Sequence, residues 1–389
     1  MKRCLLIHYG EIGLKLSNKD YFVGKLRQRI KLKLEKQFRM NFVVKHSLGR
    51  LLIPLEDDFD EKAYVDVLSR IFGIKNFKFC YLGSANIQEL GGQILALLPK
   101  ERPGNFRVKV KRSMTMDMKS VEMEREIGAM LLRGGFEVPV KMKGAEFIVD
   151  IEFLNEMSYV SFKKHEGVGG LSGNSQGKLI SLISAGIDSP VASYKMMKRG
   201  ARIIFVHFHA YPYTDKHEME QVKDLVEILG DYQFGTKLYL VPYGDIQRAI
   251  ATNLGIPDKV RIILYRRTMI RIAEKIAKKE KAKGLVTGDS FGQVASQTPE
   301  NLYAVHDAST IPLFQPLISF DKEDVIKIAE EIGTFEISKL PCKDTCTMFM
   351  PKKPEIRANV YDIRDYEKSL PLDEWVEKAL KDSELVTFD

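Results

Sequence analysis

The chain has 389 residues, enough for two or three domains, and a formal net charge of +8. Its four cysteines and the lack of any apolar run of roughly 18 residues exclude a disulfide-stabilised scaffold and a membrane-spanning protein. With no signal-peptide pattern at its start, we expect it to be cytoplasmic, with no membrane partner. Positive charge is concentrated in Met1–Arg50, which holds 13 Lys and Arg against 3 Asp and Glu. This concentration favours a nucleic-acid partner.

The first part of the chain, residues 1–75, has the pattern of a small α+β domain. Cys4–His8 predicts a strand, and apolar residues at four-residue intervals from Phe22 predict an amphipathic helix. Ser17–Asp20 has the spacing of a capping box at the start of that helix. A strand pair and a second helix are predicted at Phe42–His46, Arg50–Leu55 and Tyr64–Phe72.

A second α+β domain is predicted over residues 76–165. Its strongest strand is Phe106–Arg112, in which apolar and basic residues alternate, so that one face of the strand is wholly cationic. A surface that faces phosphates explains such a strand better than free solvent does. An amphipathic helix over Ser120–Arg133 and two closing strands, Phe147–Phe153 and Tyr159–Phe162, complete the domain. We predict that RNA contacts Arg107, Lys109, Lys111 and Arg112.

A glycine-rich segment, residues 166–177, separates these domains from the rest of the chain. It holds five glycines, a density that resists regular structure, so we interpret it as a linker. Residues 178–389 then alternate predicted strands and helices. Repeated βα units imply a parallel sheet covered on both faces, whose ligands bind at the carboxyl ends of the strands.

The loop Ser184–Ser189 is the centre of this last domain. It lies between a strand over Leu179–Ile183 and a helix that Pro190 is suited to begin. Strand, tight polar loop and helix N-terminus together favour phosphate binding. The glycine and lysine spacing of the common P-loop is absent. An ordinary turn capped by Asp188 or Ser189 is the alternative interpretation.

Further motifs make a resemblance specific. The loop resembles the S-G-G-x-D-S pyrophosphatase loop (PP-loop) of enzymes that cleave ATP to AMP and pyrophosphate, with Ala185 in place of the first glycine. Over essentially its full length the chain resembles the tRNA 4-thiouridine synthetases, or tRNA sulfurtransferases, of the ThiI family. The motifs are YGEIGLK at Tyr9–Lys15, SAGIDSPVASY at Ser184–Tyr194, HFHAYPYTD at His207–Asp215, LYRRTMIRIAEKIA at Leu264–Ala277, TGDSFGQVASQT at Thr287–Thr298 and PLISFDKEDVIKIAEEIGT at Pro316–Thr334.

The resemblance implies a fold class and a domain order. It implies an α+β ferredoxin-like domain (1–75), a THUMP RNA-binding domain (76–165), the linker (166–177) and an α/β parallel-sheet PP-loop domain of the adenine-nucleotide α-hydrolase type (178–389). Some members append a rhodanese domain with a second catalytic cysteine. The segment after the PP-loop motifs is too short for one, so we expect the rhodanese-lacking form.

The resemblance also implies a reaction and partners. The expected activity is ATP-dependent transfer of persulfide sulfur to a tRNA uridine, at position 8, through an adenylated O4, with release of AMP and pyrophosphate. Implied partners are tRNA, a cysteine desulfurase as persulfide donor and a second copy in a homodimer. Family members also supply sulfur for the thiazole of thiamine, and the motifs do not show whether this chain does so.

Site residues are carried over by position. Ser184, Gly186, Asp188 and Ser189 are expected to hold the pyrophosphate half of ATP, with Asp188 binding Mg²⁺. Lys322 matches a cation that stabilises the leaving pyrophosphate; the alternative is a surface lysine at a helix start. His207 and His209 share a strand face but lack further ligands, so a metal pair is disfavoured. The remaining expected nucleotide contacts are Leu182, Ile183, His207, Phe208, Arg266 (or its neighbour Arg267), Gly288 and Gln297.

Two cysteines lie in LPCKDTCTMF. By its place before Pro-Lys-Lys-Pro, Cys346 matches the family's sulfur-carrying cysteine, which makes it catalytic together with Asp188 and Lys322. Cys342 either resolves the persulfide or, with Cys346, helps to ligate an iron–sulfur cluster, and the sequence leaves both open. Cys4 and Cys80 lie in apolar strands and are expected to be buried.

Two other functions remain open at this point. A different PP-loop thiolase, such as a 2-thiolation enzyme, is disfavoured by the two N-terminal domains. A non-catalytic THUMP RNA-binding protein is disfavoured by the presence of Asp188, Lys322 and Cys346.

Overall fold

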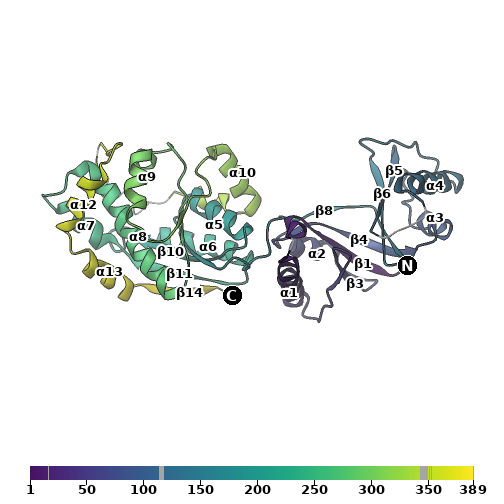
Figure 1. The fold of residues 1–389 in the computed structure, drawn as a ribbon, viewed down its shortest axis with the longest axis horizontal. Helices are drawn as coiled ribbons and strands as arrows, with labels where there is room; N and C mark the ends of the chain where they lie inside the picture. Colours follow the sequence, from purple (N-terminus) through teal and green to yellow (C-terminus); the bar gives the residue numbers. More distant parts are fainter. Residues whose placement is uncertain (16, 114–117, 342–348, 350, 352, 389) are drawn as a thin grey trace. The chain divides into compact units, whose positions relative to one another are not determined.

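The chain folds into two compact units, Met1–Ser172 and Gly173–Asp389. The structure, a computed structural model, describes all residues except 16, 114–117, 342–348, 350, 352 and 389 (Figure 1). The division between the units falls inside the segment predicted as a linker. The part of that segment before the division is built into the N-terminal unit, because Leu171 is buried in its core and the Ser172 hydroxyl donates to Phe22 O at 2.7 Å.

One sheet runs through the whole N-terminal unit, in the order β2-β3-β1-β4-β7-β6-β5, with β8 paired to β4. Its central strand β4 (Ile74–Ser84) pairs with β1 on one side and with β7 on the other. The expected boundary at residue 75 therefore falls at the start of a strand that both α+β parts share. The other strands are β1 (Arg3–Tyr9), β2 (Lys45–Ser47), β3 (Arg50–Leu55), β5 (Phe106–Arg112), β6 (Phe147–Leu154), β7 (Met157–Ser161) and β8 (His165–Glu166).

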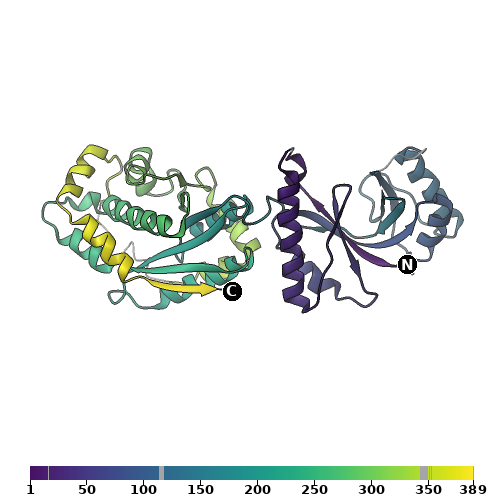
Figure 2. The ribbon, with the colours of Figure 1, turned by 60° about the horizontal axis from the view of Figure 1, so that its bottom comes forward.

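Four helices cover one side of this sheet with two apolar cores (Figures 1 and 2). The first core packs α1 (Lys19–Phe38) and α2 (Glu61–Leu68), and the second packs α3 (Ile87–Leu95) and α4 (Ser120–Arg133). The predicted capping box at the start of α1 is wrong, because the N-cap is Asn18 and makes no side-chain hydrogen bond. Helix α3 was not predicted.

The opposite face of the sheet carries a buried ion cluster that corrects the prediction of a wholly cationic face. Lys109 and Lys111 of β5 lie in register with Asp150 and Glu152 of β6. The Glu152 carboxylate, 1% exposed, contacts Lys78 Nζ at 2.9 Å, Lys111 Nζ at 3.6 Å and also His8 and Arg50. Burial alone would raise the pKa of Glu152, but hydrogen bonds and charge from His8 and Lys78 outweigh it, so the pKa lies well below its ordinary range.

The C-terminal unit is built on a second sheet, in the order β13-β12-β9-β10-β11-β14. The first five strands are parallel, and β14 runs antiparallel to β11 at the edge (Figure 2). The parallel arrangement agrees with the predicted βα repeats, but β14 was not predicted. The strands are β9 (Lys178–Leu182), β10 (Arg202–His209), β11 (Thr236–Pro242), β12 (Leu285–Val286), β13 (Leu313–Phe314) and β14 (Glu384–Phe388).

Helices pack around this sheet, and an apolar core lies between β9–β11 and the long helix α8. No described helix is long and apolar enough to cross a membrane. The helices are α5 (Asp188–Lys198), α6 (His217–Asp231), α7 (Gly244–Thr252), α8 (Arg261–Glu280), α9 (Pro299–His306), α10 (Lys322–Ile332), α11 (Phe335–Ser338), α12 (Val360–Lys368) and α13 (Leu372–Lys381).

Candidate functional site

The order of the strands marks one place in the C-terminal sheet as a binding site. From β9 the chain adds β10 and β11 on one side, and it later returns to add β12 on the other side of β9. In open parallel sheets, ligands bind at the carboxyl ends of the strands at such a switch in direction. The loop Ser184–Ser189 follows β9, and Thr287–Ser290, the start of the TGDSFGQVASQT motif, follows β12, so these two motifs of the sequence lie at this point.

Gly288 lets these two loops touch. A Cβ atom on Gly288 would lie 2.8 Å from Ser189 N and 3.0 Å from both Asp188 C and Ser189 Cα. Backbone atoms cannot yield as a flexible side chain can, so only glycine permits this approach. The residue matters for the close contact between the loop after β12 and the first turn of α5.

The Ser184–Ser189 loop is held by its own hydroxyl groups. Ser184 N donates to Ser189 Oγ at 2.9 Å, and Ser189 Oγ donates to Ser184 O at 3.2 Å. Ser193 Oγ, one turn further along α5, donates to Ser189 O at 2.8 Å. Helix α5 begins at Asp188, so the loop sits at the positive end of the helix dipole. This geometry suits an anionic ligand.

Asp188 and Lys322 meet beside this loop, although 133 residues separate them in the chain. Lys322 Nζ, at the first residue of α10, donates to Asp188 Oδ1 at 2.6 Å. The two side chains are partly exposed, at 42% for Lys322 and 27% for Asp188. The pair therefore places a cation and a carboxylate at a solvent-accessible edge of the loop, where both can exchange partners with a ligand.

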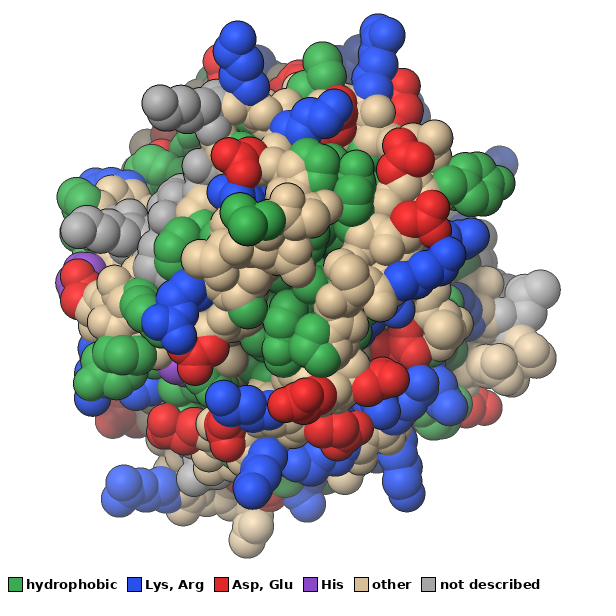
Figure 3. Space-filling view, turned by 90° about the vertical axis from the view of Figure 1, so that its left-hand side faces the viewer, with side chains coloured by type: hydrophobic (Ala, Val, Ile, Leu, Met, Phe, Trp, Pro, Cys, Tyr) green, Lys and Arg blue, Asp and Glu red, His purple; other side chains and the backbone are tan. Residues whose placement is uncertain are grey.

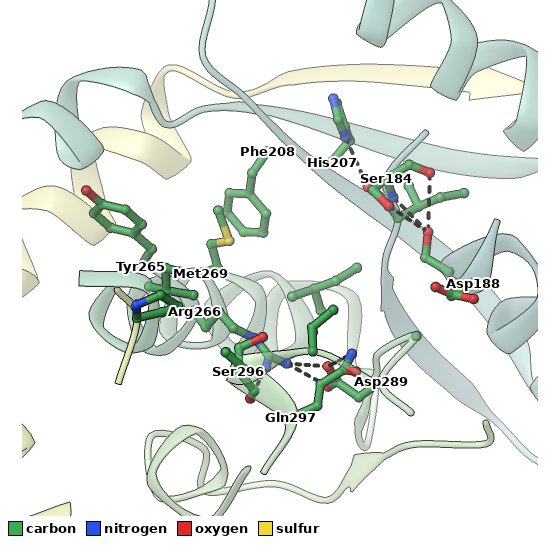
Figure 4. A pocket seen from close by; sticks show the side chains of 18 of the residues that line it. Ser184, Asp188, His207, Phe208, Tyr265, Arg266, Met269, Asp289, Ser296 and Gln297 are labelled. Carbon is green, nitrogen blue, oxygen red and sulfur yellow. Dashed lines mark hydrogen bonds and ion pairs between the residues drawn. The ribbon is translucent and has the colours of Figure 1, made fainter. Parts of the chain in front are cut away.

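A cavity of about 380 Å³ opens from the loop across the strand ends to helix α8 (Figure 4). Its wall contains Asp188 and most of the residues expected to contact the nucleotide. Gly186 and Lys322 are not part of the wall, although Gly186 belongs to the loop and Lys322 contacts Asp188. The expected residues that line the cavity are Leu182, Ile183, Ser184, Asp188, Ser189, His207, Phe208, Arg266, Gly288 and Gln297.

His207 is buried at the back of this site, with 1% of its surface exposed. Its Nδ1 lies 3.0 Å from Ile183 O, and because a carbonyl only accepts, Nδ1 carries the ring proton. Burial lowers the pKa of His207 to about 4, against an ordinary 6.5, despite this hydrogen bond. The ring is therefore neutral at physiological pH and fixes the strand end next to Phe208.

Known proteins similar to this chain belong to one family. Residues 174–372 match the family described as "Thiamine biosynthesis protein (ThiI)", and residues 4–78 match "ThiI ferredoxin-like domain". The chain is 36% identical over 401 residues to a "Probable tRNA sulfurtransferase" of Thermus thermophilus, with 100% of this chain and 95% of the relative covered. It is 38% identical over 392 residues to a protein of the same name from Clostridium kluyveri, with both covered completely. The chain belongs to the ThiI family.

Solved structures agree with this membership. A crystal structure described as a 4-thiouridine synthetase–RNA complex with bound ATP matches this ThiI chain with a TM-score of 0.87, at 34% identity and over 100% of both chains. A protein from Pyrococcus horikoshii shares the fold, with a TM-score of 0.65 at 23% identity over 86% of this chain and 100% of that one. The expected family and fold class are confirmed.

Within the ThiI fold, Arg266 and its neighbour Arg267 take different places. Arg266 lines the cavity, and its Nη2 lies 2.6 Å from Asp289 Oδ2. Arg267 is 1% exposed and points to the other side of α8, where it donates to Glu367 at 2.9 and 2.6 Å and to Asp307 at 3.0 Å. Helical geometry separates consecutive side chains by about 100°, so only Arg266 reaches the site.

Several residues of the cavity wall were not predicted. Ile262, Tyr265 and Met269 lie on α8 within one helical face that also contains Arg266. Helical spacing from Arg266 would have found them. Asp289 adjoins Gly288, but no charge pattern in the sequence indicates its role. The others are Glu218, Val294, Ala295, Ser296 and Pro354.

The two cysteines predicted to take part in sulfur transfer lie outside the residues that the structure describes. Cys342 and Cys346 are both in the segment 342–348. Among the residues the structure does describe, no group of three His, Cys, Asp or Glu side chains is arranged to hold a metal ion. Cys4 and Cys80 are buried, as expected.

The predicted RNA contacts in the ThiI N-terminal unit are largely engaged within that unit. Arg107 Nη1 donates to Met142 O at 2.9 Å, and Arg112 donates to Ser120 Oγ and Met118 O. Exposed basic side chains are found instead on α1, where Lys31 and Lys36 face solvent, whereas Arg29 is buried. The face of the C-terminal unit in Figure 3 differs, with acidic and basic side chains interspersed around apolar side chains near its centre.

Proposed function

We propose that this ThiI family member forms 4-thiouridine in tRNA, at position 8, by ATP-dependent transfer of sulfur from a persulfide. The observation that carries the proposal is the cavity whose wall joins the PP-loop to an apolar surface, with Asp188 in the wall and Lys322 bonded to Asp188 beside it. Such a cavity has room and chemistry for both halves of ATP. The similar structure with bound ATP and RNA supports the same assignment.

The proposed nucleotide pose follows from the wall of the cavity. The amides of Gly186 and Ser189 and the Ser184 hydroxyl hold the pyrophosphate half at the N-terminus of α5, because Ser184 N and Ser189 Oγ bond within the loop. The adenosine half lies toward Leu182, Phe208 and α8, where the wall is apolar. Phe208 already packs edge-on against Tyr243, with ring centroids 5.4 Å apart, so its ring is fixed for contact with a base.

The proposed chemistry makes a poor electrophile reactive. The uracil O4 attacks the α-phosphorus of ATP, which forms an O4–P bond and breaks the bond to pyrophosphate. Lys322 stabilises the negative charge that develops on the leaving pyrophosphate. The persulfide sulfur then attacks C4, and AMP leaves with the former O4 oxygen.

A magnesium ion fits this site only as a partner of the phosphates. Asp188 supplies one carboxylate, and Mg²⁺ usually takes one or two carboxylates together with phosphate oxygens and water. When bound, the ion would screen the charge of the phosphates. Asp188 would hold it and would release Lys322 for the substrate.

Sulfur delivery is proposed to use Cys346, charged with a terminal sulfur by a cysteine desulfurase. After attack on C4, a disulfide joins the base to Cys346. Attack by the Cys342 thiolate on the Cys346 sulfur releases the thiocarbonyl and leaves a disulfide between the two cysteines, which an external thiol must reduce. If the two cysteines instead ligate an iron–sulfur cluster, both single serine variants lose activity together with a visible-light chromophore.

The N-terminal unit is proposed to bind the tRNA. Its net positive charge over residues 1–50 and the exposed cations of α1 attract phosphates. Lys109 and Lys111 are weaker candidates than the sequence implied, because Asp150 and Glu152 offset them. A homodimer, and a second role in supplying sulfur for the thiamine thiazole, are proposed from family membership.

The function is tested by incubating the protein with tRNA, ATP and a persulfide donor, and by mass analysis of the nucleosides together with AMP. We expect 4-thiouridine and stoichiometric AMP. A 2-thiolated nucleoside would favour the other class of PP-loop thiolase, and tRNA binding without AMP would favour a non-catalytic RNA-binding protein. Sedimentation tests the dimer, and thiamine-free growth of a complemented strain tests the second role.

A further inference from the structure

Asp289 is a buried carboxylate at the nucleotide cavity to which neither the sequence nor the proposed chemistry assigns a role. It follows β12 and is 5% exposed. Four side chains donate to its two oxygens. Arg266 Nη2 lies 2.7 and 2.6 Å from Oδ1 and Oδ2, Thr287 Oγ1 2.7 Å and Gln315 Nε2 3.0 Å from Oδ2, and Gln297 Nε2 3.2 Å from Oδ1.

This network determines which end of the Gln297 amide is available to a ligand. An ionised carboxylate only accepts hydrogen bonds, so the amide nitrogen of Gln297 must face Asp289. The amide oxygen Oε1 is then the remaining polar atom. It is buried, and no described residue donates to it. Gln297 lines the cavity, so it offers the nucleotide an acceptor rather than a donor.

The same carboxylate changes what Arg266 contributes. Burial alone would raise the pKa of Asp289, but the Arg266 charge and the hydrogen bonds outweigh it, so the pKa lies below its ordinary value and the group stays ionised. The charge of Arg266 is therefore balanced inside the protein. Its Nη1 donates to Ser296 O at 3.1 Å, which ties α8 to the segment that carries Gln297. Arg266 thus shapes the wall rather than attracting phosphate.

We propose that Asp289 is a positioning residue that sets the polarity of the nucleotide site. By holding Gln297 with its oxygen free, it makes the site select a nucleotide that presents a hydrogen-bond donor at that point. The proposal rests on the proposed function in so far as ATP occupies this cavity. Two groups of ATP have the required chemistry, the 6-amino group of adenine and a ribose hydroxyl.

The test is calorimetric titration of the full-length protein with ATP, inosine triphosphate, 2′-deoxy-ATP and 3′-deoxy-ATP. Inosine triphosphate lacks the amino donor, and each deoxy analogue lacks one hydroxyl. For the wild type we expect one analogue to bind about tenfold more weakly than ATP, the effect of leaving a buried acceptor without its donor. Which analogue it is identifies the group.

The decisive variant is Asp289→Asn, because an asparagine amide can donate to Gln297 and lets that amide turn. We expect the ratio of dissociation constants between the weaker analogue and ATP to fall from about tenfold in the wild type to within about twofold in this variant. The matched control is Asp307→Asn. Asp307 also accepts from two arginines, Arg267 and Arg364, but lies outside the cavity. Asp307→Asn should keep the wild-type ratio of dissociation constants between the analogue and ATP, even if its melting temperature is lower.

Each possible result of these titrations either supports or overturns the role of Asp289. Equal affinity of the wild type for all four nucleotides, or full discrimination retained by folded Asp289→Asn, overturns the proposal. If Asp289→Asn does not fold, Gln297→Met decides, because methionine keeps the length of the side chain and removes the amide oxygen. The analogue that the wild type binds about tenfold more weakly than ATP should bind this variant within about twofold of ATP, and a retained tenfold difference overturns the proposal. Wild-type 4-thiouridine formation is measured in parallel, so a failure of the proposed function appears there.

Discussion

Replacing Gly288 with alanine is the sharpest test of how the site is built. The added Cβ would lie 2.8–3.0 Å from three backbone atoms of Asp188 and Ser189, several tenths of an ångström inside normal contact. Neither side can move alone, because one is the first turn of α5 and the other directly follows β12. Overpacking of this kind costs about 1–3 kcal/mol.

The Gly288→Ala protein should therefore melt about 2–12 °C lower than the wild type, since each kcal/mol lowers Tm by about 2–4 °C in a domain of this size. Because the displaced atoms belong to the PP-loop, its affinity for ATP should fall as well. Both are measured on one sample, by calorimetric melting and by nucleotide titration.

Gly186→Ala is the matched control in the same loop. Its Cβ would meet only Ser184 Oγ at 3.5 Å, an ordinary contact, so the melting temperature without nucleotide should stay within about 2 °C of the wild type. A Gly288→Ala protein that melts and binds ATP as the wild type does would show that the loops are not in the contact described.

Four more outcomes are expected. Asp188→Asn should abolish AMP release yet leave tRNA affinity within about twofold, the scatter for a distant change of charge; normal turnover would contradict its role. Arg267→Met should lower the free energy of unfolding by about 3 kcal/mol, because the buried Glu367 carboxylate loses two hydrogen bonds and keeps Arg271 as its remaining cationic partner among the described residues, whereas the exposed Arg364→Met should cost clearly less. Acidification from pH 7.5 to 5 should lower the free energy of unfolding by about 2 kcal/mol through His207. The folded pKa of His207, about 4, lies below the ordinary 6.5, so the unfolded chain binds the proton first as the pH falls. In urea titrations, His207→Gln should lose that part of the pH dependence. Binding of tRNA should weaken steeply with salt, and Lys31→Gln with Lys36→Gln should reduce the log–log slope by about 2 if both contact phosphate.

Periodic segments could be predicted closely from the sequence. Helix α4 and strand β5 have the expected residues, because a strong apolar pattern, with helical spacing in α4 and strict alternation in β5, leaves one solution for each. The position of the cavity at the carboxyl ends of the strands followed from the rule for parallel sheets. Helix α3 was missed because Gly91 and Gly92 indicate a break, whereas in the fold Gly91 lets Met130 of α4 approach: its Cβ would lie 2.9 Å from the Met130 sulfur.

The parts of the site that could not be predicted depend on side chains that pair across a long stretch of the sequence. The sequence did not decide between Arg266 and Arg267, because the choice depends on Glu367, 100 residues away in α12. The cationic face of β5 was overestimated for the same reason, since its acidic partners lie on β6, about 40 residues later. Charges that neutralise each other in space are separated in the chain, and a local pattern cannot show that they pair.

The shared strand β4 has a consequence for how this protein can be taken apart or recombined. Because β4 is hydrogen-bonded to β1 on one flank and to β7 on the other, excising residues 1–75 would remove β1 and leave β4 with a bare strand edge, which invites aggregation. Exchange of parts between related proteins should therefore succeed at Ser172/Gly173 and fail near residue 75. The N-terminal unit should therefore be transplanted only as a single piece.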